Sequence, residues 1–369
     1  MQDSLPSSSS RLARLRARMT ETGVDLVAVG PTSHLAWLAG VPAHGDERPV
    51  MLIVGARDAA FLMPALNADS IRRHTDLPFY DWSDAEGPQD ALARLLGDFG
   101  VAEGPAAVAL DETMRADFAL LLLDALPQAR RSFLDATLGW LRARKEPGEY
   151  AVLKANALMN DRAMRAAFAA LAPGVTEREV VAAVERHFAA EGAETAFASV
   201  CFGANGAFPH HDSGETPLAP GMAVLVDIGG RKDGYPSDMT RVGHFGPAPE
   251  GMAGIHAVVE AAVAAALKAA RPGVPARAVD AAARDTIAAA GYGAEFLHRT
   301  GHGLGIDIHE APYVTATSET ILEEGMVFSI EPGIYLPGRF GLRLEEIVIL
   351  RADGPEILSE LPRAAVAAG

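Results

Sequence analysis

Two segments of this chain repeat one another, and this duplication limits the possible folds more than any other feature. Residues 218–229 read LAPGMAVLVDIG and residues 322–333 read LEEGMVFSIEPG, so glycine, methionine and acidic positions recur 104 residues apart. Upstream, the tripeptide PGV at 173–175 returns at 272–274, 99 residues away. A repeat of this length predicts a duplicated α/β half-domain, in which each copy contributes two helices and a β-hairpin.

Each copy carries acidic residues where a strand needs none. Asp227 and Glu331 lie inside or directly after apolar runs, and Asp238 and Glu345 follow them across the predicted hairpins. An acid at a strand end can simply reach solvent, but a buried carboxylate is costly unless something offsets its charge. If the halves pack about a pseudo-two-fold axis, the four carboxylates converge. Two divalent cations would remove the repulsion between them.

His302 is the candidate for a fifth ligand, because glycines at 301, 303 and 305 let its ring approach a crowded centre. Taken alone, a histidine between glycines is as typical of a structural role as of a metal ligand. Together with four acids it favours manganese or cobalt, with zinc or iron also possible. Two such ions would hold and deprotonate a water molecule, which suits hydrolysis of an amide.

His210 and His309 lie 99 residues apart and form a further pair of equivalent side chains. We expect them at the mouth of the site, where they would stabilise a tetrahedral oxyanion. His211 and His298 have no such support and are expected at the surface or behind the ligands.

Two further residues of the second copy are site candidates. Arg343 precedes Glu345 by two residues, so on a strand both side chains face the same way. It would orient an acid or pair with a substrate carboxylate. Tyr335 would be either a phenol near the reacting carbonyl or an aromatic residue at the sheet edge.

The rest of the chain sets the domain organisation. Residues 1–10 are serine-rich and predicted to be disordered, residues 11–136 alternate strands and helices as in an α/β domain, and residues 137–369 contain the repeat. In the first domain the patterns predict a helix from Arg11 to Gly23, strands at 26–29, 51–54 and 60–63, and helices at 88–99 and 115–126.

Composition narrows the partners and the compartment. The formal net charge of -16 argues against nucleic acid as a partner and favours small molecules or peptides. Cys201 is the single cysteine, which excludes an intramolecular disulfide and suits a reducing compartment. No signal-peptide pattern or membrane-spanning apolar run is evident, so we expect a cytoplasmic protein.

Five motifs of the repeat resemble those of the pita-bread metallopeptidases, in the subgroup of Xaa-Pro dipeptidase (prolidase) and aminopeptidase P. They read DIGG at 227–230, SDMTR at 237–241, GHGLGIDIHE at 301–310, SIEPG at 329–333 and RLEE at 343–346. The resemblance covers residues 140–350 in detail, whereas the first domain resembles a creatinase-type N-terminal domain only in length and alternation. Glu346 stands where the family often has aspartate, which leaves the ligand set intact.

The resemblance implies a role for each matching residue. Two metal ions would be bound by five ligands, which are Asp227, Asp238, His302, Glu331 and Glu345. Asp238 and Glu345, the second acid of each hairpin, would bridge both ions. Glu331 would also act as the general base, while His210 and His309 would bind the scissile carbonyl.

We therefore expect a creatinase-like α/β domain followed by a duplicated pita-bread domain with pseudo-two-fold symmetry. The expected activity is metal-dependent hydrolysis of the bond before proline in Xaa-Pro dipeptides, by a homodimer, with Phe208 or Tyr313 against the proline ring. An aminopeptidase P acting on longer peptides remains an alternative. So do a hydrolase or lyase of the same fold acting on a small non-peptide metabolite, and a non-catalytic binding member.

Overall fold

The computed structural model describes residues 7–42, 45–102 and 104–369. The chain divides into two compact units, with the boundary along the sequence between Arg142 and Ala143. The predicted boundary lies earlier, between residues 136 and 137. The difference arises because Leu138 and Leu141 of α6 (Leu138–Ala143) are buried and Arg142 Nη1 lies 2.8 Å from His34 Nδ1, so this helix extends the first unit.

The first helix begins earlier than the sequence predicts. Helix α1 (Ser8–Thr22) starts before Arg11 because the side chain of Ser7 accepts a hydrogen bond from the backbone nitrogen of Ser10, at 3.3 Å. Residues 8–10 of the segment expected to be disordered are therefore helical, and residues 1–6 lie outside the described residues. Gly23 ends the helix in the left-handed conformation, as expected.

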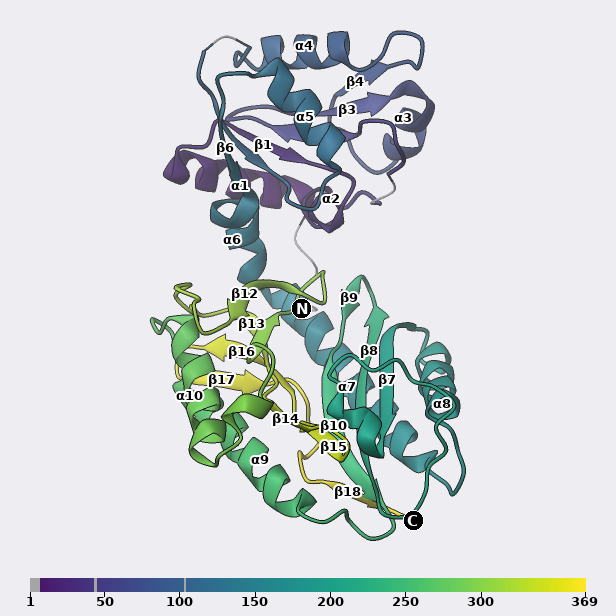
Figure 1. Cartoon of the computed structure of the whole chain (residues 1–369). Helices are drawn as coiled ribbons and strands as arrows, with labels where there is room; N and C mark the ends of the chain where they lie inside the picture. The colour runs from purple at the N-terminus through teal and green to yellow at the C-terminus, as the bar shows by residue number, and fades with distance from the viewer. Residues whose placement is uncertain (1–6, 43–44, 103) are drawn as a thin grey trace. The chain divides into compact units, whose positions relative to one another are not determined.

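A six-stranded sheet in the order β4-β3-β2-β1-β5-β6 is the centre of the first unit. Its strands are β1 (Leu26–Val29), β2 (Met51–Val54), β3 (Ala59–Pro64), β4 (Phe79–Trp82), β5 (Ala107–Leu110) and β6 (Arg130–Phe133). Helices α4 (Gln89–Asp98) and α5 (Ala116–Ala125) cover one face, where Leu95 and Phe118 pack against strand residues such as Ile53. Helices α1 and α2 (Ser33–Ala39) lie on the other side, and α3 (Ala65–Ile71) follows β3 (Figure 1).

The second unit consists of two halves, each with a pair of helices followed by strands. The first half contains α7 (Pro147–Ala169), α8 (Glu177–Ala190), β7 (Glu194–Phe202), β8 (Met222–Lys232), β9 (Tyr235–Pro236) and β10 (Met239–Phe245). The second contains α9 (Met252–Ala269), α10 (Ala276–Ala289), β11 (Gly301–Gly303), β12 (Glu310–Val314), β13 (Val327–Ile330), β14 (Gly333–Leu336), β15 (Phe340–Arg343), β16 (Glu346–Arg351) and β17 (Gly354–Ile357). The last strand, β18 (Val366–Ala368), returns to pair with β10 of the first half.

Equivalent backbone contacts in the two halves confirm the internal repeat. The nitrogen of Gly174 donates to Leu218, and the nitrogen of Gly273 donates to Leu322, both at 2.8 Å. The isolated bridge between Thr176 and Pro217 returns between Pro275 and Ile321. These positions are separated by the same 99 and 104 residues that separate the sequence repeats.

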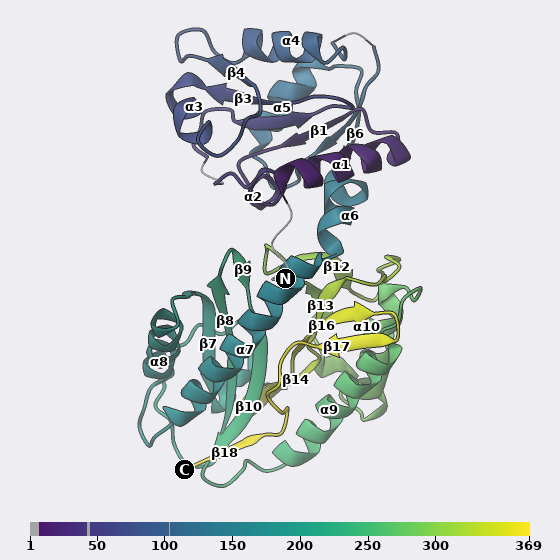
Figure 2. The same cartoon turned by 180° about the vertical axis from the view of Figure 1, so that it is seen from behind.

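The strands form two main sheets with helices on the outside. One sheet has the order β18-β10-β8-β7 and the other β12-β11-β13-β16-β17, while β14 and β15 form a separate hairpin. Figure 2 shows α7 and α9 on the same outer side of these strands. By length and hydropathy α9 is the one helix in the described residues that could cross a membrane. Its residues Val259 and Val263 lie in the core of this unit, so we interpret it as a core helix.

Candidate metal centre and active site

The predicted acids and histidines of both halves line one cavity of about 360 Å³. Asp227 lies on β8, where it pairs in register with Thr240 of β10. Asp238 directly precedes β10, the strand that pairs with β8. Glu331 follows β13, and Glu345 directly precedes β16, which pairs with β13. The cavity is lined by Phe197, Pro209, His210, Asp227, Asp238, His298, Arg299, His302, Ile308, His309, Glu331, Arg343 and Glu345.

The spacing of the side-chain atoms suits a metal ion. Ligand atoms of Asp238, His302 and Glu345 all lie within 4.8 Å of one another, and the three residues are buried. His302 Nε2 is 3.2 Å from Glu331 Oε1 and 3.7 Å from Asp238 Oδ2. The duplicated strands therefore bring acids from both halves to a single imidazole.

The electrostatics of this cluster call for positive charge. Burial, followed by repulsion from neighbouring carboxylates, raises the pKa of Asp238 and Glu345 well above the usual range. The pKa of Asp227 is raised for the same reasons. At Glu331 burial also raises the pKa, but the hydrogen bond and charge of His302 outweigh it and lower the pKa to about 2.

An unpaired oxygen adds to this requirement. Asp227 Oδ1 is buried and has no hydrogen-bond partner among the described residues. A buried carboxylate oxygen without a donor is unfavourable unless a cation meets it. The donor set of carboxylates and one imidazole therefore fits divalent cations of the manganese, cobalt, zinc or iron type.

Arg343 lies behind the ligands and holds one of them. Its three guanidinium nitrogens donate to Asp227 Oδ2 at 2.6 Å, to the Tyr335 hydroxyl at 2.7 Å and to Thr240 Oγ1 at 2.9 Å. Thr240 in turn donates to Glu345 Oε2 at 2.9 Å. Of the two roles that the sequence left open, the observed one is to orient an acid.

His298 belongs to the same hydrogen-bond network, so of its two predicted places the observed one is behind the ligands. Its Nδ1 is 2.8 Å from the Arg299 carbonyl, to which it must donate, so Nε2 accepts from the Tyr335 hydroxyl at 2.7 Å. Burial lowers the pKa of His298, in keeping with a neutral ring. His298 has no counterpart in the other half of the repeat, and its role is evident only from this contact.

The duplicated histidines both line the cavity. The centroid of the His309 ring is 4.2 Å from that of His302, and burial, then the charges of His302 and Arg299, lower the pKa of His309 to about 4. His210 enters from the loop after β7. His211 does not line the cavity, because its Nε2 lies 2.9 Å from Glu177 Oε2.

The residues predicted as apolar contacts lie outside the lining of this cavity. Phe208 and Tyr313 are 60 % and 42 % exposed and do not line the cavity. On β12 the side chains alternate, so the buried Pro312 and Val314 turn Tyr313 to the other face. Tyr335 is only 1 % exposed and also does not line the cavity, because its hydroxyl is used by Arg343 and His298.

Other side chains supply the apolar wall. Phe197, Pro209 and Ile308 line the cavity instead. The pairing of β7 with β8 is irregular between Thr195 and Phe197, and a side chain on Gly229 would meet the Phe197 ring at 2.4 Å. Simple strand alternation does not predict that the Phe197 ring lies here. Gly229, which lies opposite Phe197, leaves the space that the ring fills.

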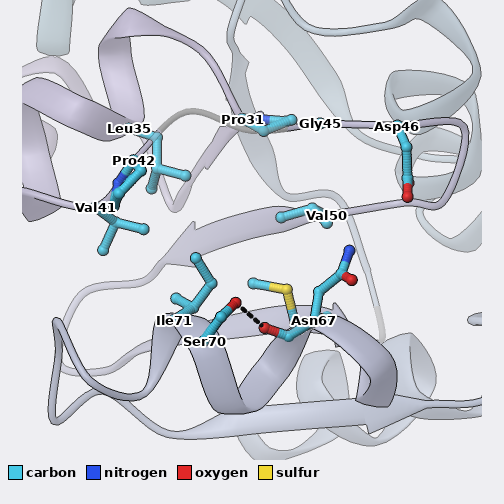
Figure 3. Close-up of a pocket in the computed structure, with 11 residues that line it drawn as sticks. Pro31, Leu35, Val41, Pro42, Gly45, Asp46, Val50, Asn67, Ser70 and Ile71 are labelled. Carbon is cyan, nitrogen blue, oxygen red and sulfur yellow. Dashed lines mark hydrogen bonds between the residues drawn. The ribbon is translucent and has the colours of Figure 1, made fainter.

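A second cavity, of about 250 Å³, lies in the first unit. Figure 3 shows mainly aliphatic and proline side chains around it, including Leu35, Val41 and Ile71, with Asp46 and Asn67 at one side. Asp46 is the one acid among the described lining residues, and there is no histidine with it. This cavity therefore lacks the ligands that a metal-dependent hydrolase needs.

His34, Asp111 and Glu112 form another acid and histidine group in the first unit. The Asp111 carboxylate already accepts hydrogen bonds from the backbone of Gly30 and Thr113 and from the hydroxyls of Thr32 and Thr113. Arg142 lies against His34 Nδ1. These contacts indicate a structural network rather than a metal site.

Comparison with known proteins agrees with the geometry of the second unit. Residues 151–352 match the metallopeptidase family M24, and residues 11–144 match the creatinase/prolidase N-terminal domain. A protein named probable dipeptidase PepE from Mycobacterium tuberculosis is 38 % identical over 359 residues, which cover 95 % of this chain and 94 % of that protein. The Xaa-Pro dipeptidase of Lactobacillus delbrueckii subsp. lactis is 32 % identical over 360 residues, covering 93 % and 95 %. The crystal structure of dipeptidase PepE from Mycobacterium ulcerans matches with a TM-score of 0.93 at 36 % identity, covering 98 % of both chains.

Proposed function

Because the chain belongs to metallopeptidase family M24, in its prolidase and aminopeptidase P subgroup, we propose that it hydrolyses the bond before proline in Xaa-Pro dipeptides using two divalent cations. The observation that carries this proposal is the convergence of four carboxylates and His302 in one cavity. Asp227, Asp238, His302, Glu331 and Glu345 are the residues that would hold the two cations.

When bound, two divalent cations would lower the pKa of water and neutralise charge that develops on the scissile carbonyl. Glu331 would accept the proton of the attacking water and pass it to the leaving proline nitrogen. Ser329 supports this role, because its hydroxyl donates to Glu331 Oε1 at 3.0 Å and fixes the carboxylate. His210 and His309 would donate hydrogen bonds to the tetrahedral oxyanion.

The size and lining of the cavity support a small, partly apolar substrate. A volume of about 360 Å³ lies near the lower end of the range for ligand sites. Phe197, Pro209 and Ile308 offer apolar surface for the pyrrolidine ring and the neighbouring side chain. In the proposal manganese is the native metal, and the enzyme acts as a cytoplasmic homodimer with residues 11–136 as its accessory domain.

The experiment that tests this proposal is restoration of activity with metal. Chelator-treated protein should release proline from Gly-Pro only after Mn²⁺ is added, and Asp238→Asn should abolish most of this activity. Asp233→Asn is the matched control, because Asp233 lies in the exposed turn of the same hairpin with a φ of 51°, which asparagine tolerates. Cleavage of Gly-Pro-Gly alone would favour aminopeptidase P, and metal-independent or absent cleavage of both peptides would contradict the proposal.

A further inference from the structure

Two arginines line the cavity, and their charges are used differently. Arg343 is 5 % exposed and donates to Asp227, Tyr335 and Thr240. Arg299 forms no ion pair with a carboxylate in the described part of the chain, and its guanidinium lies instead over the Tyr313 ring, 4.8 Å from the centroid. Of the two cavity arginines, Arg299 is therefore the one that has no carboxylate partner among the described residues.

The backbone of this segment is fixed from both sides. The Arg299 carbonyl accepts from His298 Nδ1 at 2.8 Å, and the next residue, Thr300, donates from its nitrogen and hydroxyl to the buried Asp280. The ring of Tyr313 then supports the guanidinium through a cation–π contact. A long side chain held in this way loses less entropy when it binds a ligand.

The position of Arg299 relative to the expected reaction gives it a specific partner. Arg299 lines the same cavity as His309, the histidine assigned to the scissile carbonyl. In an Xaa-Pro dipeptide the free carboxylate is on the proline residue, next to the bond that is cleaved. In a longer peptide the same position holds a neutral amide, which cannot form a charge-assisted bidentate pair with arginine.

We propose that Arg299 binds the free carboxylate of the proline residue and thereby selects dipeptides over longer peptides. This inference rests on the proposed function and adds the residue that determines its specificity. It also gives Tyr313 a role other than the predicted contact with the proline ring, namely support of the guanidinium.

The test compares two substrates that differ only in this charge, Gly-Pro and glycyl-prolinamide, with the manganese-loaded protein. Arg299→Gln should lower kcat/KM for Gly-Pro by roughly 10- to 100-fold, mainly through KM, the range expected for loss of a hydrogen bond to a charged group. Hydrolysis of glycyl-prolinamide should be nearly unchanged. Arg299→Lys should give an intermediate loss, because lysine keeps the charge but not the planar fork.

Arg351→Gln is the matched control, because Arg351 also lies over a tyrosine ring, 4.3 Å from the Tyr150 centroid, but outside the cavity. Arg351→Gln should leave the ratio of kcat/KM for the two substrates unchanged. Equal losses on both substrates in Arg299→Gln, or no loss on either, would overturn the inference while the proposed function stands. Wild-type protein that cleaves no Xaa-Pro substrate at all would overturn the proposed function and this inference with it.

Discussion

Arg343 Nη2 lies 2.6 Å from Asp227 Oδ2, and this contact connects the two halves of the repeat behind the acid cluster. Because the arginine occupies Oδ2, the buried Oδ1 is the Asp227 oxygen left for a cation. We therefore interpret Arg343 as the residue that orients a metal ligand.

Arg343→Lys should weaken metal binding more than it weakens folding. Lysine keeps one positive charge but cannot donate to Asp227, Tyr335 and Thr240 together. Loss of a partner that orients a ligand typically costs about 10- to 100-fold in metal affinity or activity. Manganese titration followed by calorimetry would measure the change, and wild-type affinity in the variant would contradict the assigned role.

Tyr335→Phe should lower kcat with little change in KM for Gly-Pro. The hydroxyl contacts Arg343 and His298 and does not line the cavity, so its removal disturbs the support of Asp227 and not the substrate contacts. Steady-state kinetics would separate the two effects. Tyr150→Phe serves as control, because that hydroxyl binds Glu356 outside the cavity. An increase in KM at constant kcat would restore the direct substrate contact first predicted for Tyr335.

Part of the site and of the fold could be predicted from the sequence. A repeat marks equivalent positions without any knowledge of packing, so the sequence alone identifies the duplicated acids and histidines. Local signals were equally sufficient for β1 and β2, whose bounds match the strands predicted at 26–29 and 51–54.

What the sequence could not predict depends on contacts between distant segments. The Phe197 ring lies at an irregular pairing of β7 with β8. The Tyr335 hydroxyl forms a hydrogen bond with His298, 37 residues away. Arg299 is the candidate for substrate binding because Arg343, the other arginine of the cavity, donates to Asp227, a contact between segments far apart in the sequence. Strand periodicity carries no information on such pairings.

The acid cluster should make the metal-free protein less stable as the pH rises. Unfolded glutamate has a pKa of about 4.3, and in the folded, metal-free protein burial and the charges of Glu331 and Asp227 raise the pKa of Glu345 well above it. The stability contributed by Glu345 is therefore fully present below that unfolded value and is lost as the pH rises through the raised folded pKa.

Glu345→Gln should consequently raise the Tm of the metal-free protein at pH 7.5, although it removes a proposed ligand. The same variant should lose most of the Tm increase that manganese gives the wild type, because binding to the folded state stabilises it. Thermal unfolding with and without metal measures both effects, with the exposed Glu324→Gln as control. A metal-free Tm equal to or below that of the wild type would argue against strong repulsion in the cluster.

Lys145→Met should destabilise the protein by about 3 to 5 kcal/mol, the usual cost of removing one partner of a buried ion pair. Lys145 Nζ lies 2.6 Å from Glu310 Oε1, with side-chain exposures of 1 % and 9 %, and Glu310 directly follows His309. Chemical denaturation would measure the loss, and Glu310→Gln added to Lys145→Met should recover part of it.

The neighbouring ion pair provides the comparison. Arg144 pairs with Glu323, which is 46 % exposed, so Arg144→Met should cost only about 0 to 1 kcal/mol. Similar losses in Arg144→Met and Lys145→Met would mean that burial does not distinguish the two pairs.

Metal content and turnover, measured together while Mn²⁺ is added to chelator-treated protein, test the central claim most directly. We expect about two bound ions per chain at saturation, as in two-metal hydrolases, with Gly-Pro hydrolysis rising as the sites fill. Asp238→Asn should reduce both quantities. Full hydrolysis of Gly-Pro by protein that holds no metal, or saturation at a single ion with full activity, would contradict the account.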